Sequence, residues 1–269
     1  MREDSGLSAA MPEGSLMISV VIPAYNEAER VWPTLSALAQ WLPQCFGDAF
    51  EVIVVSDGSA DETEFIAQRF IRALARFQNP AAQKFRLLKL PENQGKGAAV
   101  RAGLLSARGR WRLMFDADGA TPIEALALAW PLTQGDSAPD VIIGSRAVHG
   151  AAYQVRARAY RRWIGRGVHA LIAPLFARGR GSDAKIRDTQ CGFKLMTADA
   201  VTIAVAPLVL KRYLFDVEML MRAQAAGLSI LEYPVPWAHV TGSKISLFKD
   251  FWHVMLELRW LYGFKARVN

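Results

Sequence analysis

The sequence predicts an α/β fold in which a mainly parallel central sheet is flanked by helices. Short runs of β-branched residues alternate with longer helical patterns through the first half of the chain. Glycine and polar residues follow these runs directly, and 52% of the 269 residues are hydrophobic, enough for a sizeable core. Alternation of this kind is typical of βαβ units joined by right-handed crossovers.

The elements can be placed in chain order. The predicted strands are 17–23, 50–56, 85–90, 111–116 and 140–144. The predicted helices are 28–41, 61–77, 97–107 and 123–133. The strands are rich in Val, Ile and Leu, as expected of strands buried in a parallel sheet. Ligands of such sheets bind beyond the carboxyl ends of the strands, so we expect functional residues in the segments that follow them.

The net charge is concentrated in one segment. Lys and Arg total 32 against 25 Asp and Glu, which gives a net charge of +7 and a pI near 9.6. Between positions 146 and 187 there are ten basic residues and a single acidic one, whereas the rest of the chain is slightly acidic. This segment therefore favours an acidic partner: nucleic acid, a phosphate ligand or an anionic membrane.

Composition also excludes several classes of protein. Two cysteines are too few for a disulfide framework or a four-cysteine zinc site, and the hydrophobic content excludes a disordered chain. We expect residues 1–16 to be a disordered leader, because they mix charged and small residues and contain no apolar stretch of the kind that a signal peptide has. No apolar run reaches the ~18 residues of a transmembrane helix. These features predict a cytoplasmic protein that is soluble or peripheral on the inner face of the membrane.

Polar residues that can carry chemistry follow four of the predicted strands. In chain order they are Pro23-Ala24-Tyr25-Asn26-Glu27, Asp57-Gly58-Ser59, Gly95-Lys96-Gly97 with Arg101 beyond it, and Asp116-Ala117-Asp118. Taken singly, the second segment also reads as a turn with a helix cap, and the third lacks the spacing of a P-loop.

Asp116 and Asp118 give the most specific pattern. Two carboxylates one residue apart at a strand end repel each other unless a cation is shared between them. Their oxygens suit Mg²⁺ or Mn²⁺, which usually bind together with substrate phosphates, although a plain turn remains the alternative. Taken together, the four strand ends indicate a site for a nucleoside diphosphate. An acidic residue would bind the nucleobase, Lys96 and Arg101 would supply positive charge, and a metal held by carboxylates would bind the diphosphate.

Strings in both halves of the chain carry a resemblance to a known family. The first half resembles glycosyltransferase family 2 in the strings VVIPAYNEAER, VIVVSDGSADET, NQGKGAAVRAG and MFDADGATP. The second half resembles the dolichyl-phosphate β-glucosyltransferase branch of that family, which is close to the polyprenyl-phosphate mannosyltransferases. The strings that carry this resemblance are GSRAVHG, IRDTQCGFKLM, YLFDVEML and HVTGSKIS. The resemblance spans residues 17–262. Ser56 departs from it, since family members commonly carry a second Asp there.

The resemblance implies a nucleotide-diphospho-sugar transferase fold of the GT-A type and an inverting, metal-dependent hexosyltransferase. It would move glucose from UDP-glucose to a polyprenyl phosphate, with Mg²⁺ or Mn²⁺ as cofactor. The donor-binding residues implied are Pro23, Tyr25, Glu27, Asp57, Lys96, Arg101, Asp116 and Ala117. The metal ligands implied are Asp116 and Asp118, and the catalytic candidates are Asp118 and Asp188. The candidate acceptor ligands are Arg146, Arg161, Ser243 and Lys244.

The acceptor determines whether the reaction needs a base. A lipid phosphate is already ionised at neutral pH, so it needs cations rather than a general base. A neutral hydroxyl acceptor would require a carboxylate base, for which Asp188 is the first candidate and Asp216 and Glu218 are the others. A family 2 transferase acting on the hydroxyl of a glycan or small molecule is therefore the alternative enzyme. A non-enzymatic basic module for anionic membrane or nucleic acid is the other alternative, but no nucleic-acid motif is present and we expect no such partner.

Two segments are candidates for contact with an anionic membrane surface. Residues 160–176 place apolar side chains at helical spacing, with Arg161, Arg162 and Arg166 on the other face. Residues 247–262 form a second such pattern, with one apolar side predicted to hold Phe248, Phe251, Trp252, Met255 and Leu258. Core packing and a homo-oligomer contact are the alternatives for both. The expected organisation is a donor half at 17–145, an acceptor half at 146–246 and a C-terminal amphipathic helix at 247–269.

Overall fold

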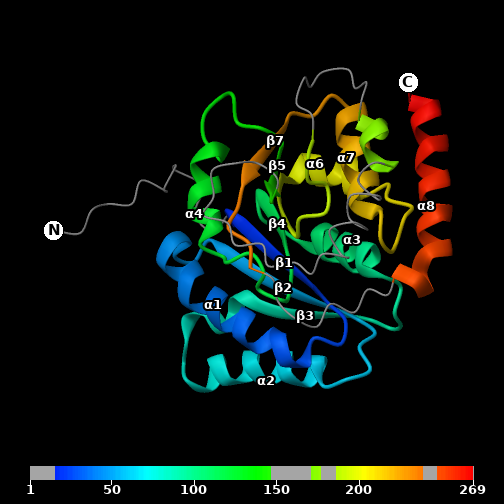
Figure 1. Cartoon of the computed structure of the whole chain (residues 1–269). Helices are drawn as coiled ribbons and strands as arrows, with labels where there is room; N and C mark the ends of the chain where they lie inside the picture. The colour runs from blue at the N-terminus through cyan, green and yellow to red at the C-terminus, as the bar shows by residue number, and fades with distance from the viewer. Residues whose placement is uncertain (1–15, 147–170, 177–185, 239–246, 269) are drawn as a thin grey trace.

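The computed structural model describes residues 16–146, 171–176, 186–238 and 247–268, and a seven-stranded sheet forms its centre (Figure 1). The strands are β1 Ile18–Ala24, β2 Phe50–Asp57, β3 Phe85–Leu90, β4 Trp111–Phe115, β5 Val141–Ser145, β6 Phe193–Thr197 and β7 Ile230–Pro234. Their order across the sheet is β3-β2-β1-β4-β6-β5-β7. Only the pairs that β6 makes with β4 and β5 are antiparallel among these strands.

The predicted α/β fold is confirmed, and the first five strands lie within a residue of their predicted positions. The sequence prediction missed β6 and β7. Strand β6 breaks the apolar pattern with a lysine at its second position, and β7 carries a glutamate and a proline within five residues. Neither segment therefore has the continuous apolar run on which a buried strand is recognised.

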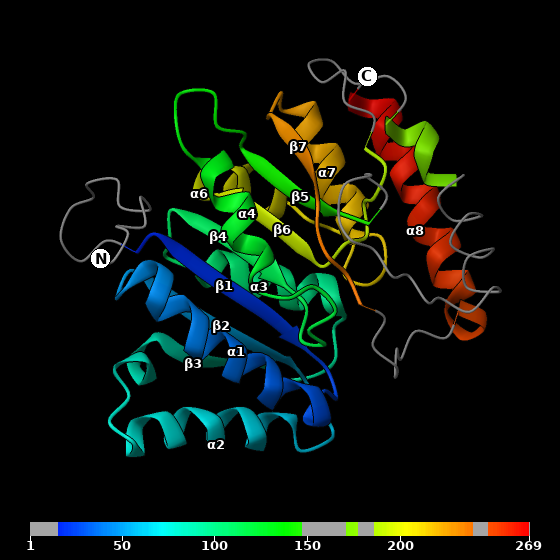
Figure 2. The ribbon, with the colours of Figure 1, turned by 60° about the vertical axis from the view of Figure 1, so that its left-hand side comes forward.

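Helices cover both faces of the sheet (Figures 1 and 2). The α-helices are α1 Ala28–Phe46, α2 Thr63–Arg76, α3 Lys96–Ser106, α4 Ala125–Ala129, α6 Ala198–Ala200, α7 Phe215–Ala225 and α8 Leu247–Val268. Shorter turns of other helix types are η1 Pro80–Lys84, η2 Trp130–Thr133 and η3 Val201–Val205. One hydrophobic cluster joins the sheet to α1, α2 and α4, and a second joins its other face to α3, α7 and α8. The sheet therefore lies between two layers, as an α/β fold requires.

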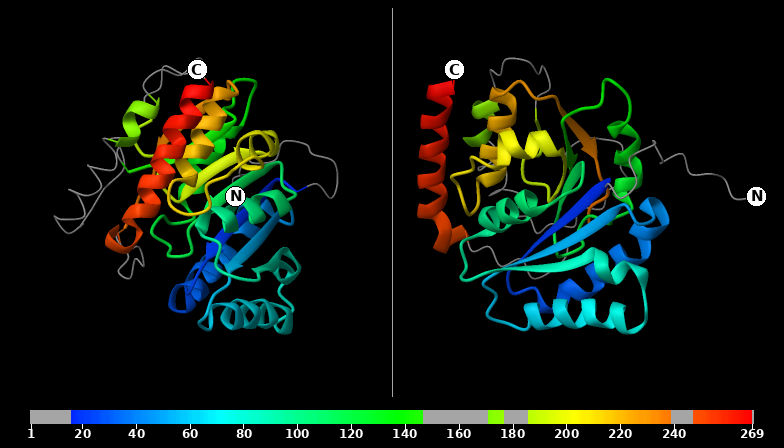
Figure 3. Two further views of the ribbon diagram at one scale, coloured as in Figure 1. Left: turned by 90° about the vertical axis from the view of Figure 1, so that its right-hand side faces the viewer. Right: turned by 180° about the vertical axis from the view of Figure 1, so that it is seen from behind.

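Helix α8 packs at the outside of the second layer, beside α7 and the helical residues 171–176 (Figure 3). The Tyr262 hydroxyl donates to the Leu171 carbonyl at 2.8 Å, and Lys265 donates to the Pro174 carbonyl. Within the described ranges, none of the helices combines the length and apolar character that a bilayer crossing requires.

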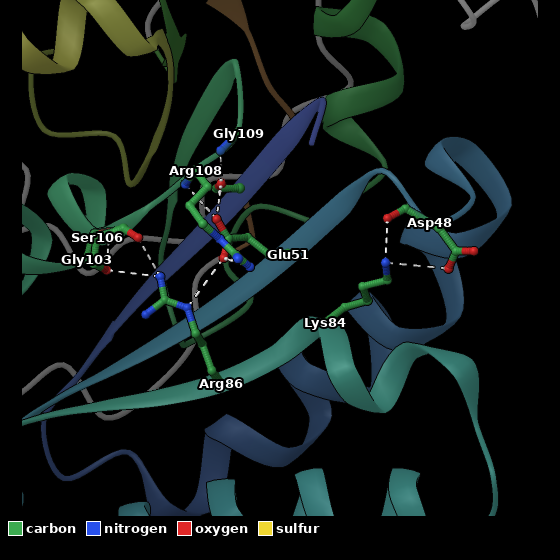
Figure 4. A network of polar contacts seen from close by, with 9 residues as sticks. Asp48, Glu51, Lys84, Arg86, Gly103, Ser106, Arg108 and Gly109 are labelled. Atoms are coloured by element: carbon green, nitrogen blue, oxygen red, sulfur yellow. Dashed lines mark hydrogen bonds and ion pairs between the residues drawn. The ribbon is translucent and has the colours of Figure 1, made fainter. Parts of the chain in front are cut away.

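A buried carboxylate joins four segments at the amino-terminal edge of the sheet (Figure 4). Glu51 is 1% exposed and accepts from the Ser19 hydroxyl at 2.8 Å and from the Arg108 amide at 2.7 Å. Its second oxygen lies 3.4 Å from Arg86 Nε and 3.3 Å from Arg108 Nη2. This network fastens β1, β2 and β3 to the segment that enters β4, at the edge opposite the candidate site.

Candidate functional site

Most of the candidate residues meet at one edge of the sheet. Strands β1, β2, β4 and β5 run in the same direction, so the segments after all four lie at the carboxyl edge. Strand β6 runs the opposite way and begins there, with Phe193 opposite Phe115. Residues 188–192, which precede β6, are thereby placed beside the turn that holds Asp116 and Asp118.

The segments after β1 and β2 are tied together by Asn26. Its backbone adopts a left-handed conformation, with φ of 54°, and its side-chain oxygen accepts from the Ala60 amide at 2.8 Å. Pro23 is buried at the end of β1, whereas Tyr25 is 40% exposed. Glu27 is held by Arg30, whose Nη2 donates to Glu27 Oε1 at 2.7 Å. The structure thus groups the residues predicted to bind the base and ribose, and their role stays a prediction.

Asp57 organises the segment that leads into α3. It is 2% exposed, and its two oxygens accept from the Gln94 and Gly95 amides, each at 2.8 Å. Gly95 has φ of 107°, and a Cβ there would lie 2.4 Å from the Lys211 carbonyl oxygen, so only glycine fits. These contacts fix the first residue of α3, which is Lys96.

Lys96 reaches the carboxylate pair after β4. Its Nζ lies 2.6 Å from Asp116 Oδ1. The Lys96 side chain is partly exposed, and its partial removal from water would lower its pKa, but the charges of Asp116 and Asp216 outweigh this and raise that pKa. Burial likewise opposes ionisation of Asp116, yet the Lys96 ammonium holds its pKa below the usual range. Asp118 Oδ1 accepts from the Ala120 amide at 3.0 Å, and the Ala117 carbonyl accepts from the Thr34 hydroxyl at 2.8 Å.

Gly192 leaves the space that the Asp116 side chain fills. A Cβ built on Gly192 would lie 2.0 Å from Asp116 Oδ2 and 2.1 Å from its Cγ, distances that no real contact tolerates. In the sequence, Gly192 stands out only as part of the string IRDTQCGFKLM. The need for glycine follows from the pairing of β6 with β4, which joins segments almost eighty positions apart.

Arg146 and Asp188 form a closed pair at the end of β5. Arg146 donates through Nε at 2.7 Å, through Nη2 at 2.9 Å and through its backbone amide at 2.9 Å. Burial would raise the pKa of Asp188, but its bonds to Arg146 outweigh burial and lower that pKa. The guanidinium also lies 5.5 Å from the Trp237 ring centroid, within cation–π range. Asp188, the first candidate for a general base, is therefore a weak base that already accepts several hydrogen bonds.

A buried lysine lies behind this edge, and the sequence analysis did not identify it. Lys194 on β6 is 0% exposed, with its Nζ 2.6 Å from Asp216 Oδ1 and 2.6 Å from the Cys191 carbonyl oxygen. Burial raises the pKa of Asp216, and the Lys194 ammonium offsets only part of that effect. The sequence shows a lysine among the apolar residues of Phe193–Met196, but its partner Asp216 lies on another element, α7.

Other candidate residues have different surroundings. Glu218 is 0% exposed, accepts from the Val209 and Leu210 amides and pairs with Arg222 Nε at 2.8 Å, a structural arrangement. Arg101 donates from Nε and Nη2 to the Ala206 carbonyl at 2.9 and 2.8 Å. Three candidate acceptor ligands lie outside the described residues: Arg161, Ser243 and Lys244.

The carboxylate pair fits a divalent cation that the substrate helps to bind. Asp116 already has a cationic group, the Lys96 ammonium, 2.6 Å from one oxygen. No cluster of three or more His, Cys, Asp or Glu side chains suited to a metal occurs among the described residues. Mg²⁺ and Mn²⁺ are commonly held by only one or two carboxylates, with substrate phosphates and waters supplying the other ligands. Asp116 and Asp118 match that donor set.

The fold and the site together define a glycosyltransferase of the GT-A type, with its carboxylate pair after β4 at the carboxyl edge of a mostly parallel sheet. The chain belongs to glycosyltransferase family 2, because the family model "Glycosyl transferase family 2" matches residues 19–202.

Two relatives with similar sequences are both named dolichyl-phosphate beta-glucosyltransferase. The chain is 38% identical over 266 residues to a dolichyl-phosphate beta-glucosyltransferase of Drosophila melanogaster, covering 93% of this chain and 77% of that protein. It is 36% identical over 234 residues to a protein of the same name from Trichomonas vaginalis, covering 84% of this chain and 65% of the relative. The chain therefore spans somewhat less than two thirds of the second relative.

A solved structure shares the fold. Glucosyl-3-phosphoglycerate synthase of Mycobacterium tuberculosis, crystallised with Mn²⁺, UDP and glucosyl-3-phosphoglycerate, superposes with a TM-score of 0.65 at 18% identity. The match covers 97% of this chain and 88% of that one. At this identity the likeness concerns the fold alone.

Proposed function

We propose that this protein transfers glucose from UDP-glucose to the phosphate of a polyprenol, with inversion at the sugar. The observation that carries the proposal is the identity of 36–38% to relatives named dolichyl-phosphate beta-glucosyltransferase, over 84–93% of the chain. Residues 17–145 would bind the donor and residues 146–246 the acceptor.

The donor is proposed to lie across the carboxyl ends of β1, β2 and β4. Pro23, Tyr25, Glu27 and Asp57 would surround the base and ribose. Lys96 would approach the diphosphate. Asp116 and Asp118 would hold Mg²⁺ or Mn²⁺. Such an ion supplies a Lewis acid for the charge that develops on a departing diphosphate. The protein's own part is to fix both carboxylates and the ammonium beside the place where that charge appears.

The acceptor is proposed to be an anion rather than a hydroxyl. A hydroxyl acceptor requires a general base, and Asp188 is poorly suited because Arg146 donates three hydrogen bonds to it and lowers its pKa. An ionised phosphate needs no base, but it does need cations near the donor. Arg146 is the described cation best placed to bind it, and Asp188 would fix the orientation of the guanidinium.

Helix α8 supports a location at an anionic membrane surface. Trp252 and Leu256 are 76% and 63% exposed on one side of the helix, and Arg259 is also exposed. Leu258, by contrast, is 4% exposed and packs into the protein. The predicted apolar side is thus divided between surface and core, because positions 252 and 258 lie about 120° apart on a helix. Exposed tryptophan and leucine beside arginine are typical of an interfacial helix.

A donor and acceptor screen tests the proposal. UDP-glucose, UDP-N-acetylglucosamine and GDP-mannose are each offered with a short polyprenyl phosphate or the matching polyprenol, with and without Mn²⁺ or Mg²⁺. Metal-dependent transfer from UDP-glucose to the phosphate alone is the expected result. Transfer to the polyprenol or to a soluble hydroxyl would favour the alternative enzyme.

Arg146→Lys separates donor effects from acceptor effects. Lysine keeps the charge beside buried Asp188 but loses the paired donors of the guanidinium. We expect the KM for polyprenyl phosphate to rise at least about tenfold, the value of one charge-assisted hydrogen bond, while the KM for UDP-glucose changes little. Equal increases in both would contradict the acceptor role.

A further inference from the structure

The Lys96–Asp116 ion pair places an ammonium on a carboxylate proposed to bind the metal. The two groups come from different elements, α3 and the end of β4, and their charged atoms are 2.6 Å apart. The backbone of the segment is fixed, since the Gly97 amide donates to the Lys211 carbonyl at 2.8 Å. The Lys96 side chain, however, is 42% exposed, so its ammonium has room to move while its Cα stays in place.

A divalent cation and this ammonium compete for Asp116. The ammonium lies on Asp116 Oδ1, and Oδ2 lies against Gly192, where a Cβ would be only 2.0 Å away. A metal held at Oδ1 would therefore share that oxygen with the ammonium. Two such cations repel strongly where water is partly excluded. Binding of the metal to Asp116 therefore requires Lys96 to leave that oxygen.

Among the residues that the structure describes, the displaced ammonium finds no equally good partner at this edge. Asp118 and Asp216 are the other carboxylates whose charges act on Lys96. Asp118 would share the metal, and Lys194 already holds Asp216 Oδ1 at 2.6 Å. Lys194 is 0% exposed and also bound to the Cys191 carbonyl, so it cannot yield its place easily. A diphosphate, by contrast, brings new negative charge for both the ammonium and the metal.

We propose that Lys96 is a placeholder for the divalent cation: it occupies Asp116 until a nucleoside diphosphate arrives, so that metal and diphosphate bind cooperatively. Lys96 then moves from Asp116 to the diphosphate as the metal takes the carboxylates. The inference rests on the proposed metal site and adds that the chain itself disfavours metal binding without nucleotide.

Mn²⁺ binding without any substrate tests this directly. The wild type, Lys96→Met and Lys84→Met are titrated with Mn²⁺, and free Mn²⁺ is measured by electron paramagnetic resonance, with and without UDP. Lys84→Met is the matched control, because it removes the same charge from a lysine that binds the Asp48 carbonyl at the opposite edge (Figure 4). Melting temperatures check that all variants are folded.

The expected result is that Lys96→Met binds Mn²⁺ more tightly without UDP and gains less from UDP than the wild type does. Without UDP, Lys96→Met should bind Mn²⁺ about ten- to a hundredfold more tightly than the wild type, the value of a hydrogen bond between charged groups. The increase in Mn²⁺ affinity caused by UDP should shrink in Lys96→Met, and Lys84→Met should behave as the wild type.

Two results would overturn the proposal. The first is an unchanged or weaker affinity of Lys96→Met for Mn²⁺ alone. The second is a gain that persists in Lys96→Met combined with Asp118→Ala, since the metal would then be binding elsewhere. Neither readout depends on sugar transfer, so failure of the glucosyltransferase assay would leave this test decisive on its own.

Discussion

Gly192→Ala isolates the geometry of Asp116 from the chemistry of the site. Alanine adds one methyl group and no charge, and the backbone of Gly192 has no positive φ that would strain it. The added Cβ would lie 2.0 Å from Asp116 Oδ2, 2.1 Å from Cγ and 2.6 Å from Oδ1. Real contacts of a Cβ do not fall below 3.0 Å, so the carboxylate must shift by about 1 Å.

The expected consequence is a large loss of activity in a folded protein. A misplacement of about 1 Å at a catalytic group costs about a hundredfold in rate, or about 2.7 kcal/mol of transition-state stabilisation. The atoms that must move belong to a side chain rather than to the backbone, so we expect the melting temperature to change little. The assay is kcat/KM for UDP-glucose with polyprenyl phosphate, accompanied by UDP binding in Mn²⁺.

Gly263→Ala is the matched control for Gly192→Ala. Gly263 lies in α8, and a Cβ there would meet nothing within 4 Å. This variant should retain wild-type kcat/KM. If Gly192→Ala kept activity within about threefold of the wild type, the carboxylate would not need the position it has, and the account of Asp116 would be refuted.

Three further predictions concern the metal, a thiol and the sheet edge. Asp118→Ala should abolish Mn²⁺-dependent turnover yet leave sedimentation with anionic vesicles intact; equal turnover in the variant would remove Asp118 from the metal site. Burial, helped by the charge of Asp188, raises the pKa of Cys191 to about 11, so iodoacetamide at pH 8 should leave it unmodified until urea unfolds the protein. Rapid labelling of native Cys191, located by mass spectrometry, would contradict that environment. Burial would raise the pKa of Glu51, but its interactions with Arg108, Ser19 and Arg86 outweigh burial and lower that pKa. The charge of Glu51 therefore stabilises the fold above about pH 4.5, and this stabilisation is lost as the pH falls below that value. Glu51→Gln should therefore lower the free energy of unfolding at pH 7 by about 1–3 kcal/mol, and urea denaturation should find a smaller difference at pH 4; a difference independent of pH would refute the assignment.

The sequence was most informative where structure is local. The first five strands and the position of Asp116 and Asp118 directly after β4 could be predicted, because each depends on a short apolar run and the residues that follow it. Lys194 and Gly192 could not be interpreted in this way. Their roles depend on β6 inserting antiparallel between β4 and β5, a pairing of segments distant in the chain that no local pattern encodes.

Two of the three acids named as candidate bases illustrate the same limit. The sequence makes Asp188 the first candidate and Asp216 another, but it shows no charge partner for either. In the structure Asp188 forms an ion pair with Arg146, and Asp216 forms one with Lys194. Both carboxylates therefore position cations at the carboxyl edge. Charge partners of this kind emerge only once the fold brings β5, β6 and α7 together (Figure 2).

The most direct measurement is mass spectrometry of the lipid fraction after incubation with UDP-glucose, Mn²⁺ and a short polyprenyl phosphate, with NMR of the anomeric centre. We predict a polyprenyl phosphate that carries one β-linked glucose in the wild type and none in Asp118→Ala. An unmodified lipid together with glucose attached to a hydroxyl acceptor, or an α-linked product, would contradict the proposed reaction.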